Sequence, residues 1–197
     1  MAVLIRKFFN RSTPEVARDL LGCKLVREIN GSILVGLISE TEAYQGENDL
    51  GCHAHSGRTK RNDIMYGEPG HAYIYFVYGM HWLLNVVTEA INIPAAILIR
   101  AIEPIEGMEI MSKNRPQLAY KSGWLNGPAK LTQALKLDGI FNGIDLCSEK
   151  SDLRIEPGIT IPFERIEISA RVGLFSVPEP WKSIPWRFRI DLRKDKQ

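Results

Sequence analysis

The sequence has few cysteines and no long run of uncharged apolar residues. Its three cysteines, Cys23, Cys52 and Cys147, are odd in number, far apart and never spaced as CxxC, which argues against a disulfide framework or a thiolate zinc site. No apolar run approaches the ~18 residues that a bilayer span requires, and charge appears after five residues. We therefore expect a soluble cytoplasmic protein without membrane association.

A strong excess of charge of one sign is also lacking. Lysine and arginine number 25 against 23 aspartates and glutamates, which gives a formal charge of +2. Such a balance neither demands nor excludes a nucleic-acid partner, so local patches must decide. The 197 residues are 45% hydrophobic and contain no repeat or linker, which predicts one substantial core and a single domain over 1–197.

Helices are predicted where capping residues meet helical spacing of apolar residues. Ser12-Thr13-Pro14-Glu15 is typical of a capping box, and the helix that follows should stop at Gly22. Two more helices are predicted, over 103–113 and from Gly127-Pro128 through Leu137.

Strands are predicted where Ile, Val, Tyr and Trp recur at strand-like spacing. The predicted strand segments are 32–44, 95–101, 165–174 and 187–192, with a long hairpin over 71–88. The segment 139–162 is rich in Gly, Pro and Asp, which favours surface loops and short strands. Strands and helices without a linker between them predict one mixed α+β core.

Two carboxylates and a phenol are expected to converge at the end of the first long strand. Alternation places Glu40, Glu42 and Tyr44 on one face and the residues between them on the other. Alone, this pattern is equally typical of ordinary charges at a strand end.

A non-periodic loop, 49–62, carries two histidines and then three cations within four residues. It fits a flexible basic loop or a phosphate-contacting segment beside a histidine that orients a polar ligand. A third interpretation makes Cys52, His53 and His55 metal ligands. We disfavour it, because compact sites usually draw on a second well-spaced pair.

The segment 73–82 is the densest aromatic stretch of the chain. Phe76 and Trp82 are expected in the core, whereas Tyr78 lies at the predicted hairpin tip, where a large ring is exposed unless it inserts into something. A base stack is one such target, and Tyr44 and Tyr75 would suit the two sides of an extruded base.

Asn85 and Arg100 are polar residues on neighbouring apolar strands. A buried arginine requires a partner, and Glu42 or Glu40 is the natural candidate. The pair could simply fix the fold, or it could also hold a water.

A set of short motifs follows one after another along the chain, from the first helix to the C-terminal strands. They are Glu42-Ala43-Tyr44, His53, Arg61-Asn62, Tyr75-x-x-Tyr78-Gly79-Met80, Asn85, Leu98 to Pro104, Gly127-Pro128-Ala129-Lys130-Leu131 and Ala170-Arg171-Val172-Gly173. Together they closely resemble the alkyladenine (3-methyladenine) DNA glycosylase family.

The resemblance implies an α+β fold with a curved, largely antiparallel sheet, flanking helices and a protruding, DNA-inserting β-hairpin, unlike the helix-hairpin-helix glycosylases. It implies a monomer that binds damaged double-stranded DNA, associates with the nucleoid and needs no metal or cofactor. The expected reaction is hydrolysis that releases an alkylated or deaminated purine and leaves an abasic site.

The resemblance also implies roles for residues. Glu42 would be the general base, and Arg100 with the backbone carbonyl of Val172 would hold the nucleophilic water. The base pocket would be formed by Tyr44, His53, Tyr75 and Asn85, the last blocking the 2-amino group of guanine. Tyr78 would be the intercalating wedge, and further DNA contacts are expected from Met80, Arg58, Lys60, Arg61, Asn62 and Lys130.

Two departures from the family pattern concern the pocket. Cys52 stands where a small residue such as alanine is expected, and the connection from Asn85 to Arg100 is longer than in mammalian members. No lysine is clearly placed to form a Schiff base, which favours hydrolysis without strand cleavage. Two alternatives stay open: a metal-dependent hydrolase built on Cys52, His53, His55 and Glu42, and a nucleic-acid-binding module without catalysis, with Tyr75 and Tyr78 as its stacking platform.

Overall fold

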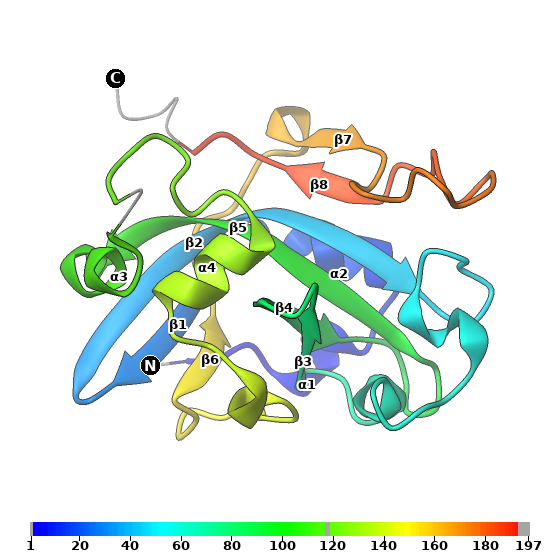
Figure 1. Ribbon diagram of the computed structural model, residues 1–197, viewed down its shortest axis with the longest axis horizontal. Helices are drawn as coiled ribbons and strands as arrows, with labels where there is room; N and C mark the ends of the chain where they lie inside the picture. The colour runs from blue at the N-terminus through cyan, green and yellow to red at the C-terminus, as the bar shows by residue number, and fades with distance from the viewer. Residues whose placement is uncertain (1, 117–118, 193–197) are drawn as a thin grey trace.

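The computed structural model describes residues 2–116 and 119–192, which form an α+β fold around a curled antiparallel sheet (Figure 1). The sheet order is β3-β4-β5-β2-β1-β6, with β8 paired to β2 and β7. Its strands are β1 (Lys24–Ile29), β2 (Ser32–Gln45), β3 (Ala72–Val77), β4 (His81–Val87), β5 (Ala95–Glu106), β6 (Leu153–Glu156), β7 (Glu167–Ser169) and β8 (Arg187–Arg189). The α+β prediction is confirmed.

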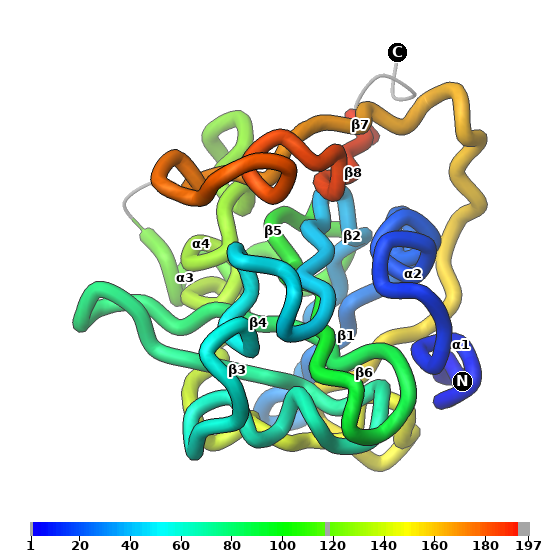
Figure 2. Tube along the Cα trace, turned by 90° about the vertical axis from the view of Figure 1, so that its right-hand side faces the viewer, coloured from blue at the N-terminus to red at the C-terminus, as the bar shows by residue number. Residues whose placement is uncertain are grey.

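Short helices surround this sheet. They are α1 (Arg6–Phe9), α2 (Thr13–Asp19), α3 (Met108–Asn114) and α4 (Pro128–Ala134), with 3-10 turns η1 (His53–Ser56), η2 (Asp63–Tyr66), η4 (Gly139–Phe141) and η5 (Phe163–Arg165). In Figure 2, α2 lies on one side of the β2–β5 pair and α3 and α4 lie on the other. None of the helices in the described ranges is long and apolar enough to cross a membrane.

The long strand β2 positions the site, because its two edges have different neighbours. One edge pairs with β5, whereas the other pairs first with β1 and then, at Glu40–Glu42, with β8. The pairing with β5 shifts register on both sides of Glu40. Such bulges bend a strand and re-aim its side chains, so the polar end of β2 lies between β5 and β8.

The helix α2 lacks the cap that the sequence predicts. Ser12 makes no side-chain capping bond, and the Thr13 amide instead donates to Glu89 Oε1 at 2.8 Å. The Thr13 hydroxyl donates to the same oxygen at 2.9 Å. A carboxylate distant in sequence therefore serves the helix end that a local box was expected to satisfy.

Several predicted boundaries are wrong. Residues 103–106, expected in a helix, extend β5 because they pair with β2, and α3 starts only after Gly107, whose φ is +74°. In 165–174 only Glu167–Ser169 is a strand, and 170–174 is a loop. The strand β1 was not predicted, although the left-handed Asn30-Gly31 turn that joins it to β2 is typical of a hairpin.

The other predicted elements are confirmed: β2, the β3–β4 hairpin, the start of β5, α4 and β8. At the hairpin turn Tyr78 and Gly79 both have positive φ, +53° and +65°, and the Met80 amide donates to the Val77 carbonyl at 3.1 Å. Figure 2 shows this turn reaching out from the chain trace.

Candidate active site

A cavity of about 620 Å³ opens between the end of β2, the β3–β4 hairpin, α4 and the loop that follows β7. Every predicted pocket residue lines it, and so do Arg100, Val172, Tyr78 and Lys130. The predicted pocket and catalytic groups that line it are Tyr44, His53, Tyr75, Asn85, Arg100 and Val172. Residues from six separate segments are therefore gathered at one opening.

Glu42 lies behind this wall with 0% exposure. Its Oε1 accepts the Val172 amide at 2.7 Å, and its Oε2 accepts the Tyr44 hydroxyl at 2.8 Å. Arg100 Nη1 approaches Oε2 at 3.4 Å. All three partners line the cavity, so the carboxylate is held in one orientation directly behind its surface.

Arg100 is shared between the two carboxylates of β2. Its Nε donates to Glu40 Oε1 at 2.7 Å, which is shorter than its contact with Glu42. Arg187 Nε donates to the same Glu40 oxygen at 2.7 Å. Burial lowers the pKa of Arg100, but the Glu42 charge and the bonded Glu40 outweigh it and raise that pKa above its ordinary value. The guanidinium therefore stays charged next to Glu42.

Tyr44 is half-buried, and its ring packs against the Arg171 guanidinium at 4.6 Å. Burial and, next, the Glu42 charge raise the pKa of Tyr44 well above its usual range. The phenol therefore keeps its proton and donates it in the hydrogen bond to Glu42. The convergence predicted from alternation along β2 is confirmed.

His53, Tyr73 and Tyr75 form an aromatic wall. His53 Nδ1 lies 2.9 Å from the Tyr73 hydroxyl, and the His53 ring meets Tyr75 edge to face at 4.5 Å. His53 keeps an exposed edge, yet desolvation by the surrounding protein, and then the nearby Arg61 charge, lower the pKa of His53 to about 4. The imidazole is therefore neutral near pH 7.

Asn85 lies deeper in the cavity and is buried. Its side-chain amide donates to the Tyr73 carbonyl at 3.1 Å. Burial, the largest cause, raises the pKa of Tyr75 to about 12, so the Tyr75 phenol is neutral as well. The deep end of the cavity is thus an uncharged, largely aromatic slot with one fixed amide.

The basic loop divides into exposed cations and a buried support. Arg58, Lys60 and Arg61 are exposed; Arg58 pairs with Asp63 at 2.6 Å, and Arg61 lies over Tyr75 at 5.2 Å. Asn62 is buried instead, and its side chain bonds backbone atoms of the same loop, including the His53 carbonyl at 3.0 Å. Asn62 therefore maintains the loop's shape instead of facing solvent.

The hairpin tip at the cavity mouth carries exposed apolar side chains. Tyr78 is 89% exposed and Met80 65%, and Phe76, which was expected in the core, is also exposed beside Trp82. Tyr78 lines the cavity edge as well. Apolar groups are thus presented to solvent at the mouth of the cavity.

Cys52, His53 and His55 do not form a metal-ligand set. Cys52 is buried, desolvation raises the pKa of its thiol to about 12, and its sulfur accepts the Ala54 amide at 3.5 Å. His55 is exposed and contacts Ser56. Across 2–116 and 119–192, no three His, Cys, Asp or Glu side chains cluster so that they could hold a metal, so the metal-dependent alternative lacks a ligand set there.

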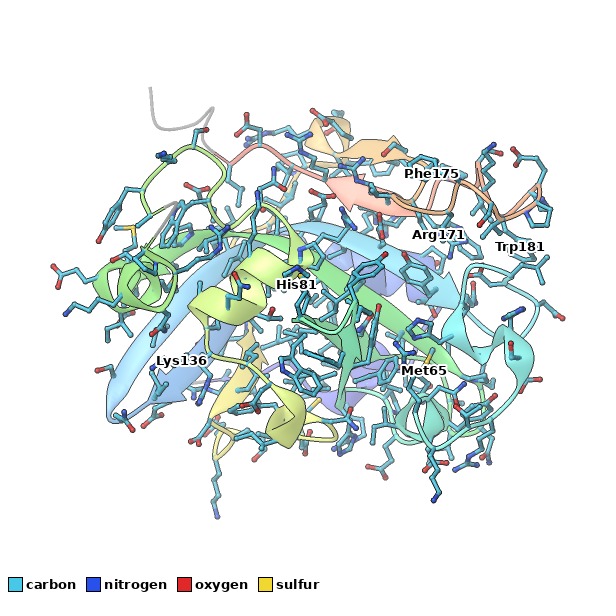
Figure 3. The ribbon with its side chains drawn as sticks, in the orientation of Figure 1. Met65, His81, Lys136, Arg171, Phe175 and Trp181 are labelled. Carbon is cyan, nitrogen blue, oxygen red and sulfur yellow. The ribbon has the colours of Figure 1, made fainter. Side chains whose placement is uncertain are left out.

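Sequence reasoning missed the pair formed by Asp49 and Arg171. The two residues bond in two places with 0% side-chain exposure, and Figure 3 shows Arg171 in the segment that leads to β8, together with Phe175 and Trp181. Arg171 was noted only as part of a motif, and Asp49 as the start of the basic loop. Their separation of 122 positions leaves no local pattern that links them.

The whole of this constellation lies within a stretch that matches one family model. The model of methylpurine-DNA glycosylase matches residues 7–194. The chain belongs to the methylpurine-DNA glycosylase family. The predicted resemblance is therefore confirmed, and family membership makes the chain a DNA glycosylase, a hydrolase of base excision repair that acts on alkylated bases in DNA.

Relatives provisionally named 3-methyladenine DNA glycosylase match along nearly the whole chain. The protein of Carboxydothermus hydrogenoformans is 47% identical over 192 residues, covering 98% of this chain and 97% of that relative. The protein of Methanocella arvoryzae is also 47% identical, over 95% of this chain and 92% of its own length. That of Desulfitobacterium hafniense is 43% identical over 97% and 96%.

Proposed function

We propose that this methylpurine-DNA glycosylase turns a damaged purine out of double-stranded DNA into the cavity and hydrolyses its N-glycosidic bond. The observation that carries the proposal is Glu42, a buried carboxylate with three fixed donors behind the cavity wall. A general base needs a defined orientation, and it must lie within hydrogen-bond reach of the water from which it removes a proton. The 3.4 Å contact with Arg100 is the longest of the three, so we place the nucleophilic water on that side.

The chemistry requires one carboxylate. Cleavage of a base from deoxyribose passes through an oxocarbenium-like state, which a nearby negative charge stabilises. An alkylated purine already carries positive charge and leaves with little or no acid catalysis. Glu42 then deprotonates water and stabilises the sugar cation, while Arg100 and the carbonyl of Val172 orient that water. The names of the relatives support 3-methyladenine as one such base.

The aromatic wall supplies the binding site for the base. Tyr44 and Tyr75 would lie against its faces, with His53 at its edge and free to bond the DNA backbone. Flat aromatic rings bind any base, and they favour an electron-poor, cationic one. Asn85, fixed by its bond to Tyr73, would collide with the 2-amino group of guanine.

DNA contacts are proposed for the hairpin and the basic loop. Tyr78 would fill the gap left by the extruded nucleotide, with Met80 beside it. Arg58, Lys60, Arg61 and Lys130 would bind DNA phosphates, because cations that contact the phosphate backbone of DNA supply most of the non-specific affinity for DNA. We propose a cytoplasmic, nucleoid-associated monomer without metal or cofactor, since the cavity and its donors come from one chain.

One incubation tests the reaction. The protein, in EDTA, is mixed with duplexes that carry 3-methyladenine, 7-methylguanine, hypoxanthine or ethenoadenine, and free base is scored separately from strand breaks. We expect base release without breaks and without borohydride trapping. Lys130 lines the cavity, so a trapped adduct that disappears in Lys130→Ala would replace hydrolysis by a lyase mechanism. Tight, salt-sensitive binding without release would favour the non-catalytic module.

A further inference from the structure

A buried ion pair ties the loop after β7 to the segment that follows β2. Arg171 Nη1 donates to Asp49 Oδ2 at 2.5 Å and Nη2 donates to Asp49 Oδ1 at 2.8 Å. Both side chains have 0% exposure. Two parallel bonds between a guanidinium and a carboxylate fix distance and angle together, and burial without such bonding would strongly destabilise both ions.

Asp49 is itself fixed by the backbone around it. Its carboxylate accepts the amides of Gln45 at 3.2 Å and Gly51 at 2.9 Å. Gly51 also leaves the room that the loop needs, since a methyl group there would lie 2.7 Å from Leu174 Cδ1 and 2.9 Å from Arg171 Nη2. The absence of a side chain at Gly51 allows the two segments to meet.

Arg171 reaches past Asp49 to the backbone next to Glu42. Its Nη1 donates to the Ala43 carbonyl at 3.0 Å, and its Nη2 donates to the Trp181 carbonyl at 3.1 Å. The guanidinium also lies over the rings of Tyr44, at 4.6 Å, and Trp186, at 5.4 Å. One side chain therefore touches both the strand that carries the general base and the tyrosine that donates to it.

The consequence for Glu42 passes through a single peptide group. The amide that donates to Glu42 Oε1 at 2.7 Å is that of Val172, and it lies in the same plane as the Arg171 carbonyl, because the peptide bond is rigid. Holding the Arg171 side chain therefore restrains the Cα atom to which that peptide group is attached.

We propose that Arg171, held by Asp49, is a positioning residue that aligns the Val172 amide and the Tyr44 ring on Glu42. The inference rests on the proposed role of Glu42 as general base. A shift of about 1 Å in a catalytic group costs on the order of 100-fold in rate, so Arg171→Lys, which keeps the charge but loses the forked bonds, is expected to slow base release about 100-fold.

The experiment separates chemistry from binding. Single-turnover release is measured on duplex DNA that carries 3-methyladenine, which lacks a 2-amino group, and affinity is measured on a duplex that carries a tetrahydrofuran abasic analogue. Arg171→Lys should bind within about twofold of the natural protein while its release rate falls. The amide proton of Val172, followed by NMR, should move upfield as its bond to Glu42 lengthens. Asp49→Asn is the second variant, with the same expected pattern.

The matched control is Arg154→Lys on β6. Arg154 also forms a buried ion pair, with Nε 2.8 Å from Glu156 Oε1, but neither residue lines the cavity. We expect it to lose thermal stability, keep its release rate within about twofold and leave the Val172 amide unmoved.

Three outcomes overturn the positioning role: a natural release rate in folded Arg171→Lys and Asp49→Asn, an unmoved Val172 amide in both, or an equal rate loss in Arg154→Lys. Failure of the natural protein to release any base would instead refute the proposed function, and the NMR comparison would still test whether Arg171 holds Val172 on Glu42.

Discussion

The two sides of the cavity are built in opposite ways. At the end of β2, Glu42 has no exposed surface and three hydrogen-bond donors, whereas at the hairpin tip Tyr78 is 89% exposed. A buried, fully bonded carboxylate keeps one geometry, and an exposed ring keeps apolar surface in water until a partner covers it. This difference supports the proposal that Glu42 performs the chemistry and that the hairpin tip contacts DNA.

The largest effect is expected from a change at Glu42, and it tests whether this side of the cavity performs the chemistry. Glu42→Gln keeps the size of the side chain but removes the base, and general base catalysis contributes about 100-fold to 10000-fold. We expect base release to fall about 1000-fold or more, with affinity for lesion-bearing duplex largely intact. Glu106→Gln, at an exposed site on β5, is the control and should behave as the natural protein. Robust release by Glu42→Gln would refute the general-base role.

A smaller effect is expected at the hairpin. Stacking of an aromatic side chain on a base is worth about 1–3 kcal/mol, so Tyr78→Ala should weaken binding to lesion-bearing duplex about tenfold, as measured by fluorescence anisotropy. Its thermal stability should not fall, because the ring covers no core. Phe163→Ala, an exposed aromatic that does not line the cavity, is the matched control. Equal affinities of Tyr78→Ala and the natural protein would refute the intercalating role of Tyr78. The proposed difference in role between the two sides of the cavity would then no longer hold.

His53, on the wall between the two sides, predicts a pH dependence of stability. Its pKa is lowered from 6.5 to about 4, so between these values the unfolded chain binds a proton that the folded chain does not. The stabilisation from neutral His53 is therefore complete above pH 6.5 and is lost as the pH falls toward 4. Urea unfolding at pH 7.5, 6.0 and 5.0 should show a shallower decline in His53→Gln than in the natural protein. Parallel declines would contradict the shifted pKa.

The smallest effect concerns the exposed loop. Lys60 is exposed, and a phosphate contact by such a side chain adds about one to the slope of log affinity against log salt concentration. Lys60→Ala should make that negative slope less steep by about one on damaged and undamaged duplex alike. Single-turnover release should not change. An unchanged slope would show that Lys60 does not contact a DNA phosphate.

Local rules explain which parts of the site could be predicted. The shared face of Glu40, Glu42 and Tyr44 follows from alternation along one strand. The Tyr78-Gly79 turn requires only two residues that accept positive φ. Both predictions are confirmed, because neither depends on what packs against these residues.

Long-range pairing explains where the predictions were wrong. Residues 103–106 begin a segment, 103–113, whose apolar residues have helical spacing, but they pair with β2, and a strand partner outweighs a weak local propensity. The loop 170–174 was predicted as part of a strand, yet Gly173 has a φ of +87° and Arg171 bonds Asp49. In both cases, residues far along the chain supplied the deciding hydrogen bonds.

The sequence by itself determined the α+β fold class, through periodicity and residue type, and its ordered motifs supplied the resemblance that identified the family and the polar groups proposed to carry the chemistry. Only the tertiary structure decided how those groups are held. It placed the Val172 amide on Glu42, split Arg100 between two carboxylates and buried the pair of Asp49 and Arg171 behind them. Orientation depends on contacts between residues 58 to 130 positions apart, which no local pattern encodes.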